Sequence, residues 1–221
     1  IPVLRQIDRL SKTCWLAGYL RYEAVYGLLP KKFTPPQLGT GPRRPLVWFG
    51  VYDAPSVVTV KTSATYTPRI NVSSNMSYAS YAQAIARIKD EIHAGNTYQV
   101  NLTFDMTVGA GCSPEALYLY LRKQQTTPYC AFLKNKDDLV LSFSPELFFR
   151  RSGDKILSRP MKGTTERGKT PSHDRAQKKG LASDKKNRAE NLMIVDLLRN
   201  DFGRICQTGT VETPSLFDVE T

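Results

Sequence analysis

The sequence predicts a protein of the mixed α+β class. Aromatic and β-branched runs separated by glycine and proline are typical of strands, and three segments carry the apolar spacing and capping residues of helices. Several predicted strands follow one another directly, as in a meander. The chain has 221 residues, of which 41% are apolar and 23% charged, so it can form a globular core. No apolar run approaches the about 18 residues that a membrane-spanning helix needs.

The first third of the chain is predicted to be mainly sheet. Residues 15–22 and 46–52 combine aromatic and branched side chains with single glycines, which favours strands. Residues 30–45 are rich in proline, and we expect a loop there because proline disrupts strand ladders and helix interiors. Residues 63–77 are polar and are expected to lead into the next unit. A domain boundary is therefore predicted between residues 76 and 77.

The second part begins with the clearest helix. Ser77 is a suitable N-cap, apolar residues from Tyr78 to Ile92 recur at intervals of three and four, and Gly95 follows the helix end. Residues 97–106 alternate strictly between apolar and polar side chains, which predicts a strand. Its polar face, which includes Gln99, is expected to meet either solvent or the wall of a polar cavity.

The remaining elements are predicted from the same kinds of signal. Ser113 and Pro114 begin a helix that ends near residue 125. Ser183 is expected to cap a last helix, with Asp184 in its first turn, and Gly203 at its end can take the left-handed conformation. Strands are predicted at 129–133, 139–143, 147–150 and 155–158, a long polar loop at 160–183, and short strands after residue 203.

The net charge of +11 is concentrated in one stretch. Thirteen Lys or Arg but only four Asp or Glu lie between residues 150 and 188. This stretch is either a solvated basic loop or a surface that attracts a small anionic molecule. A nucleic-acid binder is disfavoured, because almost no aromatic side chain lies among these basic residues and no zinc or helical DNA-reading module is visible.

The cysteines and histidines show no spacing that is typical of a disulfide framework or a zinc site. We expect reduced thiols in a cytoplasmic protein, since no signal peptide is visible either. The residues concerned are Cys14, Cys112, Cys130, Cys206, His93 and His173.

One motif points to a different class of protein. Residues 163–170 match G-x-x-x-x-G-K-[ST], the phosphate-binding loop of nucleotide-binding modules. That loop needs a buried apolar strand before it and a helix directly after it, so that backbone N–H groups meet the phosphate. A polar strand ending at Pro160 precedes the motif, and Pro171 follows it, so we expect no helix to continue from Lys169. A P-loop-type nucleotide-binding module using Gly163 to Thr170 stays an alternative.

Three segments, in order, resemble the chorismate-utilising enzymes, and most closely the aminodeoxychorismate synthase branch of that family. They are G-N-T-Y-Q-V-N-L at 95–102, S-P-E-L-F at 144–148 with R-P-M-K-G-T at 159–164, and K-N-R-A-E-N-L-M-I-V-D-L-L-R-N-D at 186–201. The resemblance implies a layered α/β/β/α sandwich, here incomplete. Residues 1–76 would be a partial N-terminal region, and 77–221 the N-terminal part of the chorismate-binding catalytic domain, whose C-terminal part is absent.

The resemblance also implies roles for individual residues. Glu146 would be the general acid and Glu190 a Mg²⁺ ligand, while Gly163 and Thr164 would offer a backbone N–H and a hydroxyl to a substrate carboxylate. The chemistry agrees with these roles, because the departure of a hydroxyl group from chorismate needs a proton donor and a cation that stabilises the carboxylate electrons.

Lys162 and Gln99 distinguish the members of the family. Aminodeoxychorismate synthases are similar to this chain in the lysine of P-[IM]-K-G-T, where anthranilate synthases usually have a small residue. That lysine is thought to attack the ring, expel the hydroxyl and later be displaced by ammonia, which requires an uncharged amine. Isochorismate and salicylate synthases carry a lysine at the position of Gln99 to activate water, a role that glutamine cannot fill.

The resemblance therefore implies that chorismate and ammonia are converted to 4-amino-4-deoxychorismate. Ammonia would come from a glutaminase subunit, and a separate lyase would release p-aminobenzoate for folate. No nucleic acid and no membrane is expected as a partner. An anthranilate synthase component I is the alternative within the same fold, and it differs in the product formed.

Overall fold

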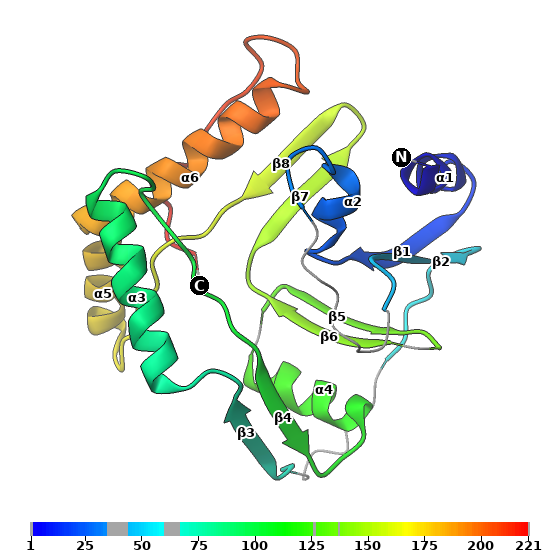
Figure 1. Ribbon diagram of the computed structural model, residues 1–221, viewed down its shortest axis with the longest axis horizontal. Coiled ribbons are helices and arrows are strands. Elements are labelled where there is room, and N and C mark those ends of the chain that lie inside the picture. Colours follow the sequence, from blue (N-terminus) through cyan, green and yellow to red (C-terminus); the bar gives the residue numbers. More distant parts are fainter. Residues whose placement is uncertain (1, 35–43, 60–66, 126, 137, 221) are drawn as a thin grey trace. The chain divides into compact units, whose positions relative to one another are not determined.

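The structure, a computed structural model, describes residues 2–34, 44–59, 67–125, 127–136 and 138–220. It divides into two compact units, which are described separately: residues 1–126 with 131–141 form unit 1, and residues 127–130 with 142–221 form unit 2. The mixture of helices and antiparallel strand pairs agrees with the predicted α+β class (Figure 1). No helix of the described residues is long and apolar enough to cross a membrane.

Unit 1 begins with an antiparallel strand pair. Strand β1 (Trp15–Leu20) pairs with β2 (Val47–Tyr52), and Trp15 lies opposite Tyr52, so both predicted strands are confirmed. Two short helices, α1 (Pro2–Leu10) and α2 (Ala24–Leu28), were not expected from the sequence. Most of the loop predicted at 30–45 lies outside the described residues.

Helix α3 (Tyr78–His93) confirms the prediction for this segment in detail. The Ser77 hydroxyl accepts a hydrogen bond from the backbone N–H of Ser80 at 3.1 Å, as an N-cap does. Gly95, after the helix end, has a φ of 76°, a conformation that glycine adopts without strain.

The strand predicted at 97–106 is wrong. Residues 97–105 have no regular secondary structure, and the strand of this region is β4 (Met106–Ala110), which pairs with β3 (Ile70–Ser74). The predicted polar lead-in at 63–77 therefore contains a strand in its described part. A strand needs a neighbour for its backbone groups, and β3 provides one for β4 but not for the preceding residues.

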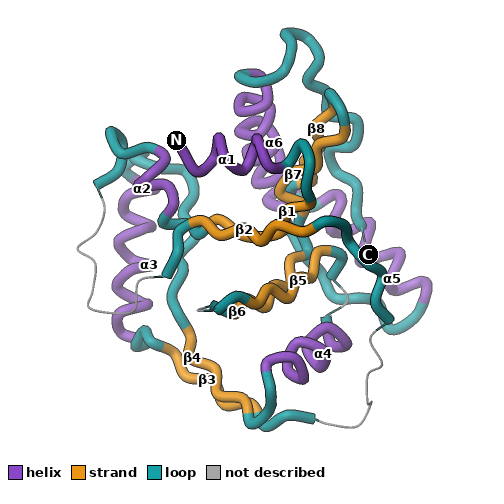
Figure 2. The backbone as a smooth tube through the Cα atoms, turned by 90° about the vertical axis from the view of Figure 1, so that its right-hand side faces the viewer, coloured by secondary structure: helices purple, strands orange, loops and turns teal. Residues whose placement is uncertain are grey.

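Helix α4 (Pro114–Gln124) begins at the predicted cap, since the Ser113 hydroxyl accepts from the N–H of Ala116 at 3.2 Å. It lies beside residues 131–134 of β5 (Tyr129–Lys134), which belong to the same unit (Figure 2), and β5 pairs with β6 (Leu139–Ser144). Within unit 1, the ring of Tyr118 packs on that of Phe132 with centroids 5.4 Å apart.

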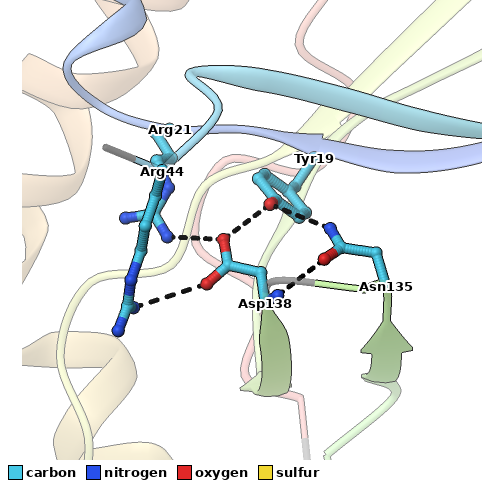
Figure 3. Close-up of polar contacts among 5 residues, drawn as sticks. All are labelled: Tyr19, Arg21, Arg44, Asn135 and Asp138. Atoms are coloured by element: carbon cyan, nitrogen blue, oxygen red, sulfur yellow. Dashed lines mark hydrogen bonds and ion pairs between the residues drawn. The ribbon is translucent and has the colours of Figure 1, made fainter. Parts of the chain in front are cut away.

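A polar cluster joins β1 to the turn before β6 within unit 1 (Figure 3). The Asp138 carboxylate, 3% exposed, accepts hydrogen bonds from the Tyr19 hydroxyl at 2.7 Å and from Arg21 at 2.8 Å. Arg44 forms an ion pair with its other oxygen at 3.4 Å. The Asn135 side chain accepts from the Asp138 N–H at 2.6 Å and donates to the Tyr19 hydroxyl at 3.4 Å. The cluster thus connects segments that are far apart in the sequence.

Unit 2 begins with a hairpin of β7 (Leu147–Ser152) and β8 (Lys155–Arg159), which turns at Gly153. All four strands predicted between residues 129 and 158 are confirmed. They form two separate pairs, β5 with β6 and β7 with β8, instead of one continuous meander.

The polar loop predicted at 160–183 is wrong in its second half, which forms helix α5 (Pro171–Ser183). The last helix, α6 (Lys185–Gly203), is capped by Asp184, which accepts from the N–H of Asn187 at 2.8 Å, and not by Ser183. Gly203 belongs to the helix and is not left-handed, and no strand follows it among the described residues up to 220.

The segment after α6 returns along that helix in Figure 1. The guanidinium of Arg188 lies over the ring of Phe217 at 3.9 Å from its centroid, and the Asn191 amide donates to the carbonyl of Leu216. These contacts hold the segment after α6 against that helix.

Candidate active site

Glu146 and Lys162 lie at the same end of the β7–β8 hairpin. Glu146 occupies the turn before β7, where the Ser144 hydroxyl accepts from the Glu146 N–H at 3.2 Å. Leu147 pairs with Arg159, so the residues just before Leu147 and just after Arg159 are neighbours. Glu146 directly precedes Leu147 and Lys162 is the third residue after Arg159, so both adjoin this end of the hairpin in the sequence. Glu146 is exposed and Lys162 half-buried.

The loop after Lys162 is packed against the first turn of α6. Gly163 has a φ of 77°, and a Cβ atom added to it would lie 2.9 Å from the Cγ atom of Asn187. Only glycine satisfies both the backbone conformation and the space available here. Thr164, the next residue, is exposed, so its hydroxyl is open to a ligand.

Glu190 lies one helical turn beyond Asn187. Because residues three apart lie on the same face of a helix, Glu190 is on the side of α6 that Gly163 packs against. Its carboxylate is 30% exposed and pairs with Lys186 at 3.8 Å. No group of three or more His, Cys, Asp or Glu in the described part of the chain is arranged to hold a metal ion.

Gln99 belongs to unit 1, in the irregular segment that precedes β4. Its side chain is half-buried, whereas the adjacent Tyr98 and Val100 are exposed. The predicted polar face is therefore partly covered, although the segment is not a strand. The other five predicted site residues all belong to unit 2.

The far end of the loop is held by a cluster that sequence reasoning missed, named here the Asp174 lock: Arg167, Gly168 and Asp174. The Asp174 carboxylate accepts two hydrogen bonds from the Arg167 guanidinium, at 2.6 and 3.0 Å, and one from the Gly168 N–H at 3.0 Å. Arg167, followed by the Gly168 N–H, lowers the pKa of Asp174, and Asp174 raises the pKa of Arg167. Thr170 followed by Pro171, with an acid three residues later, is a helix-start signal that could have revealed this cluster.

One of the two expectations about the nucleotide-binding motif was wrong, because helix α5 follows it directly, with Thr170 as its cap. The strand before the motif is, as expected, not a buried apolar one: β8 alternates exposed and half-buried residues and is half of an antiparallel hairpin. At the start of α5, the Gly168 N–H bonds to the Asp174 carboxylate and the Lys169 N–H to His173 Nδ1. A carboxylate of the chain thus occupies the place that a phosphate would need.

The comparisons with known proteins place this arrangement of strand, loop and helices in a family of enzymes. The model of the chorismate binding enzyme family matches residues 53–221, and the chain belongs to this family.

Individual relatives show which members of the family the chain resembles. The chain is 39% identical over 180 residues to the aminodeoxychorismate synthase component 1 of Klebsiella aerogenes, which covers 81% of this chain and 38% of the relative. It is 40% identical over 147 residues to the protein of the same name from Escherichia coli, covering 66% and 32%. An anthranilate synthase alpha subunit 2 of Arabidopsis thaliana is 37% identical over 147 residues, covering 66% and 24%. The chain therefore spans less than two fifths of the length of these relatives.

Proposed function

We propose that the protein is the synthase component that converts chorismate and ammonia to 4-amino-4-deoxychorismate and water. The observation that carries this proposal is the position of Lys162, half-buried on the loop after β8, at the hairpin end that also holds Glu146. The family membership and the names of the two relatives from Klebsiella aerogenes and Escherichia coli support it. The layered α/β/β/α sandwich, the domain boundary at 76/77 and the cytoplasmic location belong to the same proposal.

The residues of unit 2 have complementary chemical roles in this reaction. The amine of Lys162 attacks the chorismate ring and forms a C–N bond, while the C–O bond to the hydroxyl group breaks. Glu146 donates the proton with which the hydroxyl leaves as water, because hydroxide is a poor leaving group. Ammonia then forms the new C–N bond and displaces the lysine, whose amine is released unchanged. The extra proton on the product nitrogen passes to the Glu146 carboxylate, so that protons balance over one turnover.

The substrate carboxylate is bound by the start of the loop. Gly163 offers a backbone N–H and Thr164 a hydroxyl, and the left-handed backbone at Gly163 presents such donors to an anion. The basic stretch 150–188 attracts the dicarboxylate to this surface. Gln99 orients the substrate and does not deprotonate water, since a neutral amide cannot act as a base.

Mg²⁺ is the proposed cofactor, and Glu190 is its proposed ligand. Mg²⁺ is commonly bound by one or two carboxylates together with substrate oxygens and water, and a half-buried carboxylate beside the loop fits one of these positions. The bound ion would stabilise the carboxylate electrons as the hydroxyl departs. Lys186, which pairs with Glu190 at 3.8 Å, must release it first.

A glutaminase subunit is the proposed source of ammonia. The name "component 1" of the relatives indicates a further component in those proteins. Release of p-aminobenzoate from the product requires elimination of the pyruvyl group, which we assign to a separate lyase.

The test compares two lysines of one loop. In the full-length protein supplied with chorismate, Mg²⁺ and ammonium, Lys162→Ala should lower the rate of aminodeoxychorismate formation by about 10³-fold or more, as expected for loss of a nucleophile. Lys169→Ala removes an exposed lysine of the same loop and should change the rate by less than about twofold. Products are separated by chromatography. Equal rates for Lys162→Ala and the unaltered protein would exclude the proposal.

An anthranilate synthase is the second candidate, and the identity of 37% to the Arabidopsis subunit favours it. The same assay decides between the two, because anthranilate is fluorescent and accumulates without a lyase. If the unaltered protein makes anthranilate as its main product, the second candidate replaces the first. Lys162 is the residue that argues against this outcome.

A further inference from the structure

The Asp174 lock has no role in the chemistry described above, yet it holds the loop on which that chemistry depends. The loop from Lys162 to Gly168 is fixed at both ends by a glycine in close contact with a helix. At its start, Gly163 packs on Asn187 of α6. At its end, a Cβ atom added to Gly168 would lie 2.0 Å from the backbone nitrogen of Asp174, so the loop backbone lies directly against α5.

Asp174 makes the contacts that can hold this end in place. Its carboxylate is 15% exposed and accepts three hydrogen bonds, two of them from the planar fork of Arg167. Such bidentate pairs fix orientation as well as distance. Asp174 itself is fixed in the first turn of α5, where the helix dipole favours a negative charge. The Arg167 side chain is 69% exposed, so the lock lies at the protein surface and not in a core.

We infer that Asp174 is a positioning residue. Through Arg167 and the Gly168 N–H it holds the loop in the position from which Lys162, Gly163 and Thr164 can contact the substrate. This inference rests on the proposed function. Displacement of a reacting group by about 1 Å can lower a rate about 10²-fold, so a surface ion pair can control catalysis without touching the substrate.

Asp174→Asn tests the inference in the full-length protein, since it keeps the side-chain shape and removes the charge. The kcat with chorismate and ammonium should fall about 10- to 100-fold, because the loop carries the nucleophile Lys162. The KM for chorismate should rise about 3- to 10-fold, because the same loop binds the substrate carboxylate. Loss of folded protein alone would lower the apparent kcat and leave KM unchanged. Arg167→Gln, at an exposed position, should give smaller changes in the same direction.

Hydrogen exchange of the backbone amides measures how firmly the Asp174 lock holds the loop, and it needs no enzymatic turnover. In Asp174→Asn, the backbone amides of residues 160–170 should exchange about tenfold faster, and those of α6 should not change. Glu115→Gln is the matched control, because Glu115 is also a first-turn acid with an ion pair, to Lys134 at 3.2 Å, and lies in unit 1. It should leave residues 160–170 and both kinetic constants unchanged.

The inference is overturned by any of three results: unchanged exchange at 160–170 in both loop variants, faster exchange throughout unit 2, or an unchanged KM. If the unaltered protein makes anthranilate, the proposed function fails, while exchange and the kinetics of anthranilate formation still test the lock.

Discussion

Asp138 shows how one residue can organise a large part of unit 1. Its buried carboxylate is bound by the Tyr19 hydroxyl of β1, by the guanidinium of Arg21 directly after β1 and by Arg44, which lies before β2. The hydrogen bond from Tyr19, followed by the one from Arg21, lowers the pKa of Asp138, and the same contact raises the pKa of Tyr19. A charge in this position stabilises the fold only while its partners are present.

Asp138→Asn should therefore destabilise the full-length protein at neutral pH, with the midpoint of thermal unfolding lowered by roughly 5–10 °C. The folded-state pKa is below the unfolded value of about 3.9, so the stabilisation by Asp138 is complete above that pH and is lost as the pH falls through the lowered value. The difference in midpoint between Asp138→Asn and the unaltered protein should shrink accordingly on acidification from pH 6 toward pH 3. Asp8→Asn removes an exposed pair with Lys12 and should have little effect at any pH. An equal loss in unfolding midpoint for Asp138→Asn and Asp8→Asn would contradict the stabilising role assigned to Asp138.

At the scale of elements, the sequence predicts a helix or strand well where the whole signal is local. Ser77 and Ser113 cap helices where the sequence predicts them, because a cap and an apolar face are both encoded within a few residues. The alternation at 97–106 predicts a strand that is absent, since pairing depends on a distant partner. Helix α5 was missed although Thr170 and Pro171 mark its start, because its polar composition suggested a loop.

In the candidate site, too, local motifs identify single residues but not the contacts between distant ones. The motifs identify Lys162 and Glu146 one by one, and the register of β7 with β8, which no local pattern contains, brings them to one hairpin end. The contact of Gly163 with Asn187 joins residues 24 positions apart and could not be predicted from spacing.

The packing of the loop on α6 can be measured with glycine variants. Gly163→Ala should lower the free energy of unfolding by about 1–2 kcal/mol for the left-handed backbone and by about 1 kcal/mol more for the contact with Asn187. Gly95→Ala is the matched control, since Gly95 has nearly the same φ, 76°, and an added Cβ would meet nothing within 4 Å. In an Asn187→Ala background the additional cost of Gly163→Ala should disappear. Urea denaturation of the full-length protein measures all four variants, and equal losses of free energy for Gly163→Ala and Gly95→Ala would refute the contact between Gly163 and Asn187.

At the scale of the whole molecule, the described residues bury very little apolar surface. Ala24, 5% exposed, is the one apolar residue of the described ranges that is buried. Val72 and Val108 face each other across β3 and β4 on one side of the pair, yet they are 56% and 52% exposed, and Phe148 on β7 is 80% exposed. Because apolar burial is the main term that favours folding, faces of this kind require a covering surface.

The 221-residue chain on its own should therefore behave as a loosely packed protein. We expect it to bind the dye ANS and to unfold on heating without a cooperative transition, because exposed apolar faces and fluctuating packing produce both properties. Changing both Val72 and Val108 to Thr keeps their shape and strand propensity and should lower the ANS signal. Ser73→Thr, on the opposite face of the same strand pair, should leave that signal unchanged. A sharp calorimetric transition of the isolated chain without dye binding would mean that these faces are covered within the chain itself, and the exposure described for β3, β4 and β7 would then be incorrect.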